Sequence, residues 1–176
     1  MSLRLAHVVL QTNRIPEMRE WYGQVLDAEV VYGDDRFCFM SFDEEHHRVA
    51  FLNFEPLAPR EPSATLLSAG KAPGLHHMAF TFSTLDELLD RYDRLKAAGI
   101  TPHFCVNHGP TTSMYFKDPD GNSVELQIDN FATAAEGKAY LTSAAFERNP
   151  IGVEYDPEDL KARYRAGASV AELVAI

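Results

Sequence analysis

The sequence predicts an α+β fold in which two βαβββ units pair to form a curved mixed sheet, followed by a helical tail. Two observations indicate this fold. The order strand, helix and three strands occurs twice, and each copy opens with a histidine and three apolar residues, HVVL at 7–10 and HMAF at 77–80. Such a repeat favours a fold built from duplicated units. Because the helix of each unit covers only one sheet face, two paired units would form a cup lined by strand residues.

The first unit is predicted over residues 1–54. Residues 3–12 alternate imperfectly and contain apolar pairs, as is typical of a strand buried on both faces. Apolar side chains recur at helical spacing over residues 16–26, and Asn13 is a candidate cap before Pro16 in the first turn. Three β-rich stretches follow at residues 28–32, 36–42 and 46–54.

The second unit is predicted over residues 75–129. It opens with a strand at 75–83. Thr84 and Glu87 have the spacing of a capping box, and the helix that they begin is expected to end at Gly99. Three further strands are expected at residues 101–107, 111–116 and 122–128.

Two segments lie outside the repeated units. Residues 55–74 contain four of the ten prolines and little periodicity, which predicts a linker or surface loop. Residues 130–176 are expected to form a helical C-terminal extension, with helices near 133–146 and 157–166 that pack on the sheet. The whole chain is expected to form one compact domain.

The composition narrows the classes of partner. The chain has 176 residues and a formal net charge of −10. This acidic excess argues against nucleic acid and anionic membranes as partners, because both bind clustered Lys and Arg. Small molecules are therefore the expected ligands.

The two cysteines and the distribution of apolar residues bear on location. Cys38 and Cys105 show no CxxC spacing, and the N-terminus has no apolar signal segment. No apolar run approaches the roughly 20 residues that span a bilayer. We therefore expect a soluble protein in the reducing cytoplasm. Open sheet edges favour a homodimer.

His7, His77 and Glu125 are candidate metal ligands. The two histidines occupy equivalent positions of the repeat, and Glu125 is a lone carboxylate in an apolar strand. A buried carboxylate without a partner costs several kcal/mol, so a cation is expected beside it. Two imidazoles and one carboxylate form the facial triad of non-haem Fe(II), although Zn(II) takes the same ligand types. The first unit has Ala50 at the position equivalent to Glu125, which favours three protein ligands over four.

Three motifs carry a resemblance to a known family. They are HVVL at 7–10, HMAF at 77–80 and, above all, YFKDPDGNSVEL at 115–126. On these motifs residues 3–128 resemble the vicinal-oxygen-chelate superfamily, which contains glyoxalases, bleomycin-resistance proteins and dioxygenases. The superfamily pairs βαβββ modules around a metal, and its members differ in reaction.

Further motifs are similar to the type I extradiol ring-cleavage dioxygenases, the relatives of biphenyl-diol and catechol 2,3-dioxygenases. In EHHRVAF at 45–51, His47 corresponds to the acid-base histidine of that family. Tyr115 precedes Glu125 by the family spacing and corresponds to the residue that contacts the substrate oxygen. His108 corresponds to the histidine before that tyrosine, at a shorter spacing than in relatives. The resemblance thus implies an Fe(II) enzyme, with Mn(II) or Zn(II) as alternatives, that cleaves a small aromatic diol with O₂ in the catabolism of aromatic compounds.

Two neighbouring histidines are given no role. By strand alternation, His46 and His76 should point to the opposite face from His47 and His77.

Two other functions remain open at this point: a non-redox metal enzyme of the same fold, such as a glyoxalase, isomerase or epimerase, and a protein that binds a small molecule without turnover. The position of Ala50 weighs against the first, and the complete set of metal donors weighs against the second.

Overall fold

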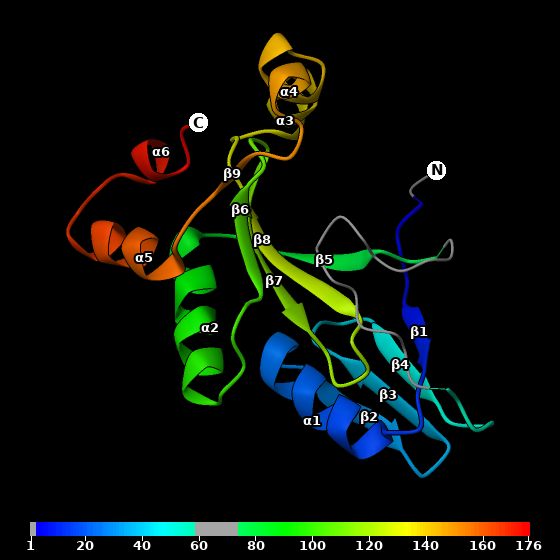
Figure 1. Ribbon diagram of the computed structural model, residues 1–176. Helices are drawn as coiled ribbons and strands as arrows, with labels where there is room; N and C mark the ends of the chain where they lie inside the picture. The colour runs from blue at the N-terminus through cyan, green and yellow to red at the C-terminus, as the bar shows by residue number, and fades with distance from the viewer. Residues whose placement is uncertain (1–2, 59–73) are drawn as a thin grey trace. The chain divides into compact units, whose positions relative to one another are not determined.

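The computed structural model describes residues 3–58 and 74–176, whose helices and strands fall into two compact units (Figure 1). Unit 1 comprises Met1–Pro73 with Asp118–Asn122, and unit 2 comprises Gly74–Lys117 with Ser123–Ile176. Most of the linker predicted at 55–74 lies outside the described residues. Among the described helices, none is both long enough and apolar enough to cross a bilayer.

Unit 1 is a four-stranded mixed sheet with one helix, in the predicted order βαβββ. The strands lie in the order β1-β4-β3-β2, with β1 parallel to β4 and the other neighbours antiparallel. The helix contributes its apolar side to the core, where Met18, Tyr22 and Val25 are fully buried. The elements are β1 (Val8–Gln11), α1 (Ile15–Leu26), β2 (Glu29–Gly33), β3 (Phe37–Ser41) and β4 (Val49–Leu52).

The expected cap of α1 is wrong. Arg14 occupies the N-cap position and makes no side-chain capping bond, while Pro16 lies in the first turn as predicted. Asn13 instead donates its side-chain N–H groups to Asn53 Oδ1 at 2.7 Å and to the carbonyl of Glu55 at 2.9 Å. Asn13 thus ties the chain after β1 to the chain after β4.

Unit 2 repeats the βαβββ order and adds one short strand. Its sheet has the order β5-β8-β7-β6-β9, with β5 parallel to β8. The predicted capping box of Thr84 and Glu87 is present, and the chain leaves the helix through Gly99 at φ +79°. The elements are β5 (His77–Phe82), α2 (Leu85–Ala97), β6 (Phe104–Asn107), β7 (Thr111–Lys117), β8 (Ser123–Asp129) and β9 (Val153–Glu154).

The C-terminal extension belongs to unit 2 and is mostly helical, as predicted. The helix expected at 133–146 is divided into α3 (Ala134–Leu141) and α4 (Ala144–Arg148), because Ser143 caps a new helix. α5 (Pro157–Arg165) lies alongside α2 in Figure 1 and is joined to it by ion pairs. These pairs are Lys96–Glu158 at 2.5 Å, Asp93–Lys161 at 2.6 Å and Asp86–Arg165 at 2.7 Å. The sequence did not predict β9 or α6 (Val170–Leu173).

The turn that connects β7 to β8 belongs to unit 1. The buried hydroxyl of Tyr22 in α1 donates to Asp118 Oδ2 at 3.1 Å, and Arg14 Nη1 donates to the carbonyl of Pro119 at 2.7 Å. Asp118 also accepts hydrogen bonds from the backbone N–H groups of Asp120 and Asn122. Burial raises the pKa of Asp118, so these donors are needed to stabilise its carboxylate.

Candidate active site

Glu125 lies at the centre of a polar cluster in unit 2. It is only 3% exposed, in the middle of β8, and its Oε2 lies 3.0 Å from Nε2 of His77 at the start of β5. Burial alone would raise the pKa of Glu125, but hydrogen bonds with His77, Ser113 and Tyr115 outweigh burial, so the pKa lies below its ordinary value. The lone carboxylate noted in the sequence is therefore surrounded by polar groups.

The donors in this cluster fit a divalent metal. Two donor atoms that each lie about 2.1 Å from one ion, with a right angle between the two bonds, are about 3 Å apart. His77 Nε2 and Glu125 Oε2 have this separation. Over residues 3–58 and 74–176, the structure contains no group of three or more His, Cys, Asp or Glu side chains arranged to hold an ion. The structure thus brings together two of the three predicted ligands in unit 2, whereas His7 lies in unit 1.

Tyr115 and His108 join the same cluster. Tyr115 pairs with Glu125 across the antiparallel strands β7 and β8, which explains the sequence spacing between them. The Tyr115 hydroxyl lies 2.9 Å from His108 Nε2, and the rings of Tyr115 and His77 are nearly perpendicular, with 5.4 Å between their centroids. His108 Nδ1 lies 2.6 Å from the carbonyl oxygen of Ile151. Four of the six predicted site residues therefore form one connected group in unit 2.

The other two predicted residues meet in unit 1. The rings of His7 and His47 stack with centroids 4.2 Å apart. Burial and the neighbouring His7 and His46 lower the pKa of His47. The metal-ligand candidate of the first repeat, His7, is thus in direct contact with the acid-base candidate, His47.

The expectation that His46 and His76 point away from the site is wrong. His46 Nδ1 lies 2.6 Å from His47 Nδ1, and His76 Nδ1 lies 2.7 Å from the corresponding atom of His77. His46 and His47 lie in the turn before β4, and His76 precedes β5, so strand alternation does not govern their directions.

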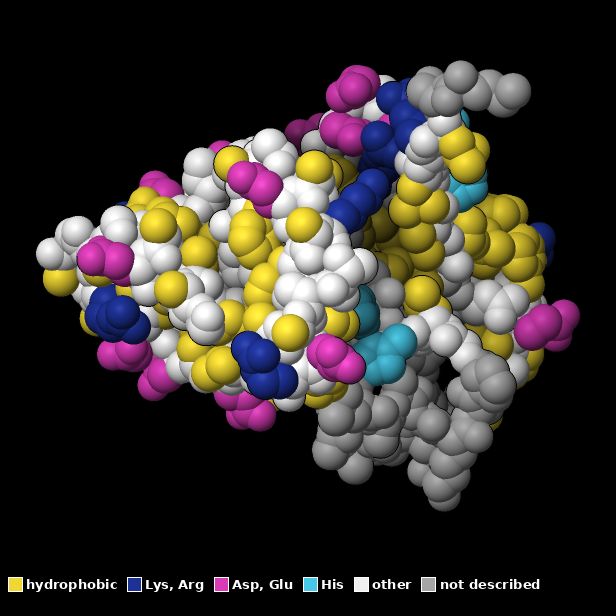
Figure 2. All heavy atoms as spheres, turned by 90° about the horizontal axis from the view of Figure 1, so that it is seen from above, with side chains coloured by type: hydrophobic (Ala, Val, Ile, Leu, Met, Phe, Trp, Pro, Cys, Tyr) yellow, Lys and Arg dark blue, Asp and Glu magenta, His cyan; other side chains and the backbone are white. Residues whose placement is uncertain are grey.

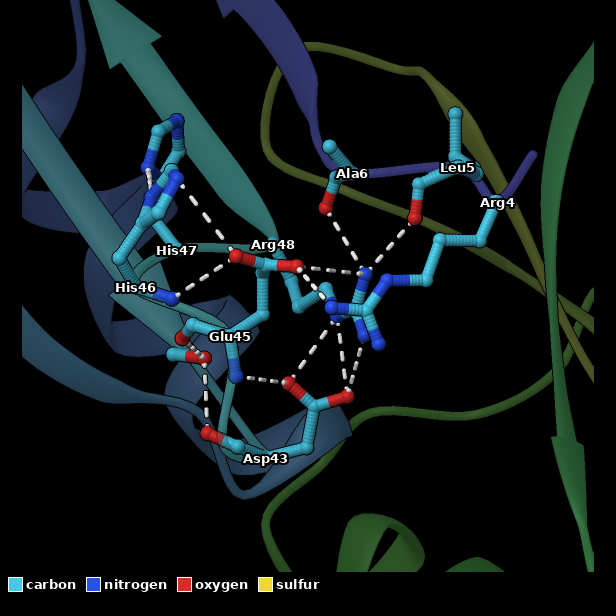
Figure 3. Close-up of polar contacts among 9 residues, drawn as sticks. Arg4, Leu5, Ala6, Asp43, Glu45, His46, His47 and Arg48 are labelled. Atoms are coloured by element: carbon cyan, nitrogen blue, oxygen red, sulfur yellow. Dashed lines mark hydrogen bonds and ion pairs between the residues drawn. The ribbon is translucent and has the colours of Figure 1, made fainter. Parts of the chain in front are cut away.

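Arg48 joins the segment before His7 to the turn before β4 (Figure 3). Its Nη1 donates to the carbonyls of Leu5 and Ala6 at 2.7 and 3.0 Å. Its Nε donates to both carboxylate oxygens of Asp43, at 3.0 and 2.9 Å. Planar guanidinium geometry suits this two-sided contact. Arg48 has no role predicted from the sequence, although its position directly after the His-His pair is a signal that could have found it.

The strand registers support the predicted equivalence of Ala50 and Glu125. Val9 pairs with Ala50 between β1 and β4, and Ala79 pairs with Glu125 between β5 and β8. Ala50 is fully buried, so the first unit offers no carboxylate at this position.

Two further residues of this cluster, Ser113 and Ile151, were not predicted from the sequence. Ser113 is fully buried in β7 and hydrogen-bonds Glu125. Its place two residues before Tyr115, on the same face of β7, was a signal that could have found it. Ile151 contributes only a backbone carbonyl, which no side-chain motif records.

The surface is acidic but not uniformly so. On the face drawn in Figure 2, acidic side chains are dispersed and many lie beside Lys or Arg. Histidine side chains reach the surface on this face. Imidazole groups are therefore accessible to a ligand from solvent.

Known proteins share both the sequence pattern and the fold. Residues 4–126 match the Glyoxalase/Bleomycin resistance protein/Dioxygenase superfamily. The chain is 51% identical to biphenyl-2,3-diol 1,2-dioxygenase 2 of Rhodococcus globerulus, over 95% of this chain and 84% of that protein. It is 48% identical to biphenyl-2,3-diol 1,2-dioxygenase 3 of the same organism, over 97% of this chain and 86% of that protein.

The fold is also that of solved structures. A fosfomycin resistance protein from Listeria monocytogenes, complexed with Mn(II) and sulfate, superposes with a TM-score of 0.57 at 21% identity, over 80% of this chain and 99% of that chain. This likeness confirms the predicted α+β fold of βαβββ units. The sequence matches show that the chain belongs to the glyoxalase/bleomycin resistance protein/dioxygenase superfamily and is a dioxygenase within it.

Proposed function

We propose that this dioxygenase uses Fe(II) to cleave a catechol-type aromatic ring in the extradiol manner, with His7, His77 and Glu125 as the metal ligands. The observation that carries the proposal is the surroundings of Glu125. The buried Glu125 carboxylate lies 3.0 Å from the His77 imidazole. Glu125 is also paired with Tyr115 on the neighbouring strand, and the Tyr115 hydroxyl contacts a second imidazole. Relatives named as biphenyl-2,3-diol dioxygenases support a vicinal aromatic diol as the substrate.

The ligand types suit this metal. Two imidazoles and one carboxylate leave open positions, at which Fe(II) would bring the diol and O₂ together and allow electrons to pass from the ring to oxygen. Mn(II) accepts the same donors. The alternative of a non-redox metal enzyme with a fourth protein ligand has less support, because Ala50 occupies the position equivalent to Glu125.

Tyr115 and His108 would handle the proton of the diol. Tyr115 is buried and is paired with the proposed ligand Glu125. Its hydroxyl would therefore hydrogen-bond an oxygen of a diol bound to the metal. His108 Nε2 lies 2.9 Å from that hydroxyl and would receive a proton through it. His47, stacked on His7, would supply a proton to the oxygen side of the reaction.

The test is oxygen consumption by anaerobically purified protein loaded with Fe(II). Catechol, 3-methylcatechol and 2,3-dihydroxybiphenyl form the panel, and the electrode reading is compared with the appearance of a yellow ring-cleavage product. We expect one O₂ consumed per ring cleaved. Glu125→Gln, which removes the charge but keeps the side-chain shape, should abolish turnover.

A matched control is Glu147→Gln, which makes the same change at an exposed position of α4. It should retain full activity. Failure of the Fe(II)-loaded protein to consume O₂ with any diol of the panel, with Zn(II) as the metal found in carefully isolated protein, would show that the proposal is wrong.

A further inference from the structure

The C-terminal extension surrounds the loop that carries His108. β9 lies beside β6 at the edge of the sheet, with Val153 opposite Asn107 (Figure 1). Asn130, just after β8, donates its side-chain amide to Asn107 Oδ1 at 3.0 Å and to the carbonyl of Gly109 at 2.9 Å. The loop between β6 and β7 is therefore fixed from both sides by residues of the same unit.

The contacts of the His108 ring define which nitrogen carries its proton. The carbonyl oxygen of Ile151 can only accept a hydrogen bond, so Nδ1 at 2.6 Å must be the donor. In the neutral ring, Nε2 then has a free lone pair. The atom next to Nε2 is the Tyr115 hydroxyl at 2.9 Å, which also hydrogen-bonds Glu125.

Gly152 allows the Ile151 carbonyl to come this close. Its φ of +100° lies in the left-handed region. A Cβ added at this position would lie 2.0 Å from the carbonyl oxygen of Asn107 and 2.7 Å from the Cα of His108, distances at which the backbone would have to move. Asn149 fixes the same turn, since its side chain accepts from the Gly152 N–H at 3.0 Å and donates to the Gly152 carbonyl at 2.8 Å.

We propose that Ile151 and Gly152 are positioning residues that hold His108 in the tautomer protonated at Nδ1. This tautomer leaves the Nε2 lone pair beside the Tyr115 hydroxyl, so a new N–H bond can form at Nε2 with the hydroxyl proton while a diol O–H bond breaks and its proton passes to the tyrosine oxygen. The Nδ1–H bond to Ile151 is unchanged and stabilises the resulting imidazolium. The C-terminal extension is thereby part of the proton-transfer machinery. The catalytic consequence rests on the function proposed above.

The tautomer can be measured without metal or substrate. Protein labelled with ¹⁵N at histidine is examined metal-free by long-range ¹H–¹⁵N NMR at a pH where imidazole is neutral, and His108→Gln identifies the signals of His108. We expect wild-type His108 to be protonated at Nδ1 alone. Gly152→Ala should populate the Nε2-protonated tautomer. Gly167→Ala is the matched control, because φ is +97° at Gly167 and an added Cβ meets nothing within 4 Å.

A second variant covers the case in which Gly152→Ala does not fold. Asn149→Ala removes both side-chain bonds to the Gly152 turn at an exposed position and should also populate the second tautomer. In the Fe(II)-loaded enzyme, either variant should lower kcat about tenfold or more with little change in KM, because proton transfer contributes roughly 100-fold or more to such reactions.

Two results would overturn the inference. One is a wild-type His108 protonated at Nε2 or present as a mixture of tautomers. The other is a folded Gly152→Ala or Asn149→Ala protein that keeps the wild-type spectrum. Absence of O₂ uptake by the wild-type enzyme would instead refute the proposed function and leave the tautomer result standing.

Discussion

Tyr22→Phe removes one oxygen atom from the centre of unit 1 and should destabilise the protein. The Tyr22 hydroxyl donates to Asp118 at 3.1 Å, and both side chains are buried. Every hydrogen bond that the Asp118 carboxyl group makes in the described structure is accepted from a donor, as expected for an ionised carboxylate. A hydrogen bond to a charged group contributes about 1.5–3 kcal/mol, and for a chain of this size each kcal/mol shifts Tm by about 2–4 °C. We therefore expect Tm to fall by about 3–12 °C.

The assay is thermal and urea unfolding, followed by circular dichroism at neutral pH. Tyr32→Phe is the matched control, because it removes the same atom from a 2.8 Å hydrogen bond to Asp34 at the surface. Solvent replaces that bond, so the control should melt like the wild type. Equal melting temperatures for the two variants would refute the conclusion that the buried hydroxyl stabilises the Asp118 turn.

Three other predictions concern charge and reactivity. The pKa of Glu158 is lowered to about 2 by hydrogen bonds from side chains of α2 and α5, so its contribution to stability should be complete above its ordinary pKa of 4.5 and lost as pH falls toward 2. The difference in free energy of unfolding between wild type and Glu158→Gln, measured with urea, should therefore shrink as pH falls from 4.5 toward 2. Arg48→Gln should weaken Fe(II) binding about 10–100-fold in anaerobic titrations, since it disturbs the segment before a ligand, whereas Arg14→Gln, which also loses a bond to a backbone carbonyl, should not. Burial raises the pKa of Cys105 to about 12, so mass spectrometry should show iodoacetamide labelling at pH 8 only after unfolding.

Most of the fold could be predicted because its signals are local. The capping box of Thr84 and Glu87 defines the start of α2 within a few residues. Helical spacing in α1 likewise depends only on nearby positions, and all of its buried side chains except Ile15 lie within the predicted range 16–26. The repeated histidine motifs then aligned the two units, and the register of Ala50 and Glu125 agrees with that alignment.

The site was predicted only in part, because some of its contacts are not local. Tyr115 and Glu125 were found through their spacing, which a hairpin converts into a cross-strand pair. The partner of His108 is the carbonyl of Ile151, far along the chain and in a segment without a motif. The predicted direction of the His46 side chain was wrong, because the predicted strand began at residue 46, where the chain turns.

The turn at Asp118–Asn122 has a consequence for the autonomy of the duplicated halves. It is encoded within the second copy of the repeat but belongs to unit 1, where it accepts the Tyr22 hydroxyl. A fragment that ends at residue 73 would therefore contain a complete βαβββ order and still leave that buried hydroxyl without its acceptor. The two copies are similar in topology, yet the first depends on the hairpin turn of the second for the acceptor of its buried hydroxyl, so an exchange of the first half should carry that turn with it.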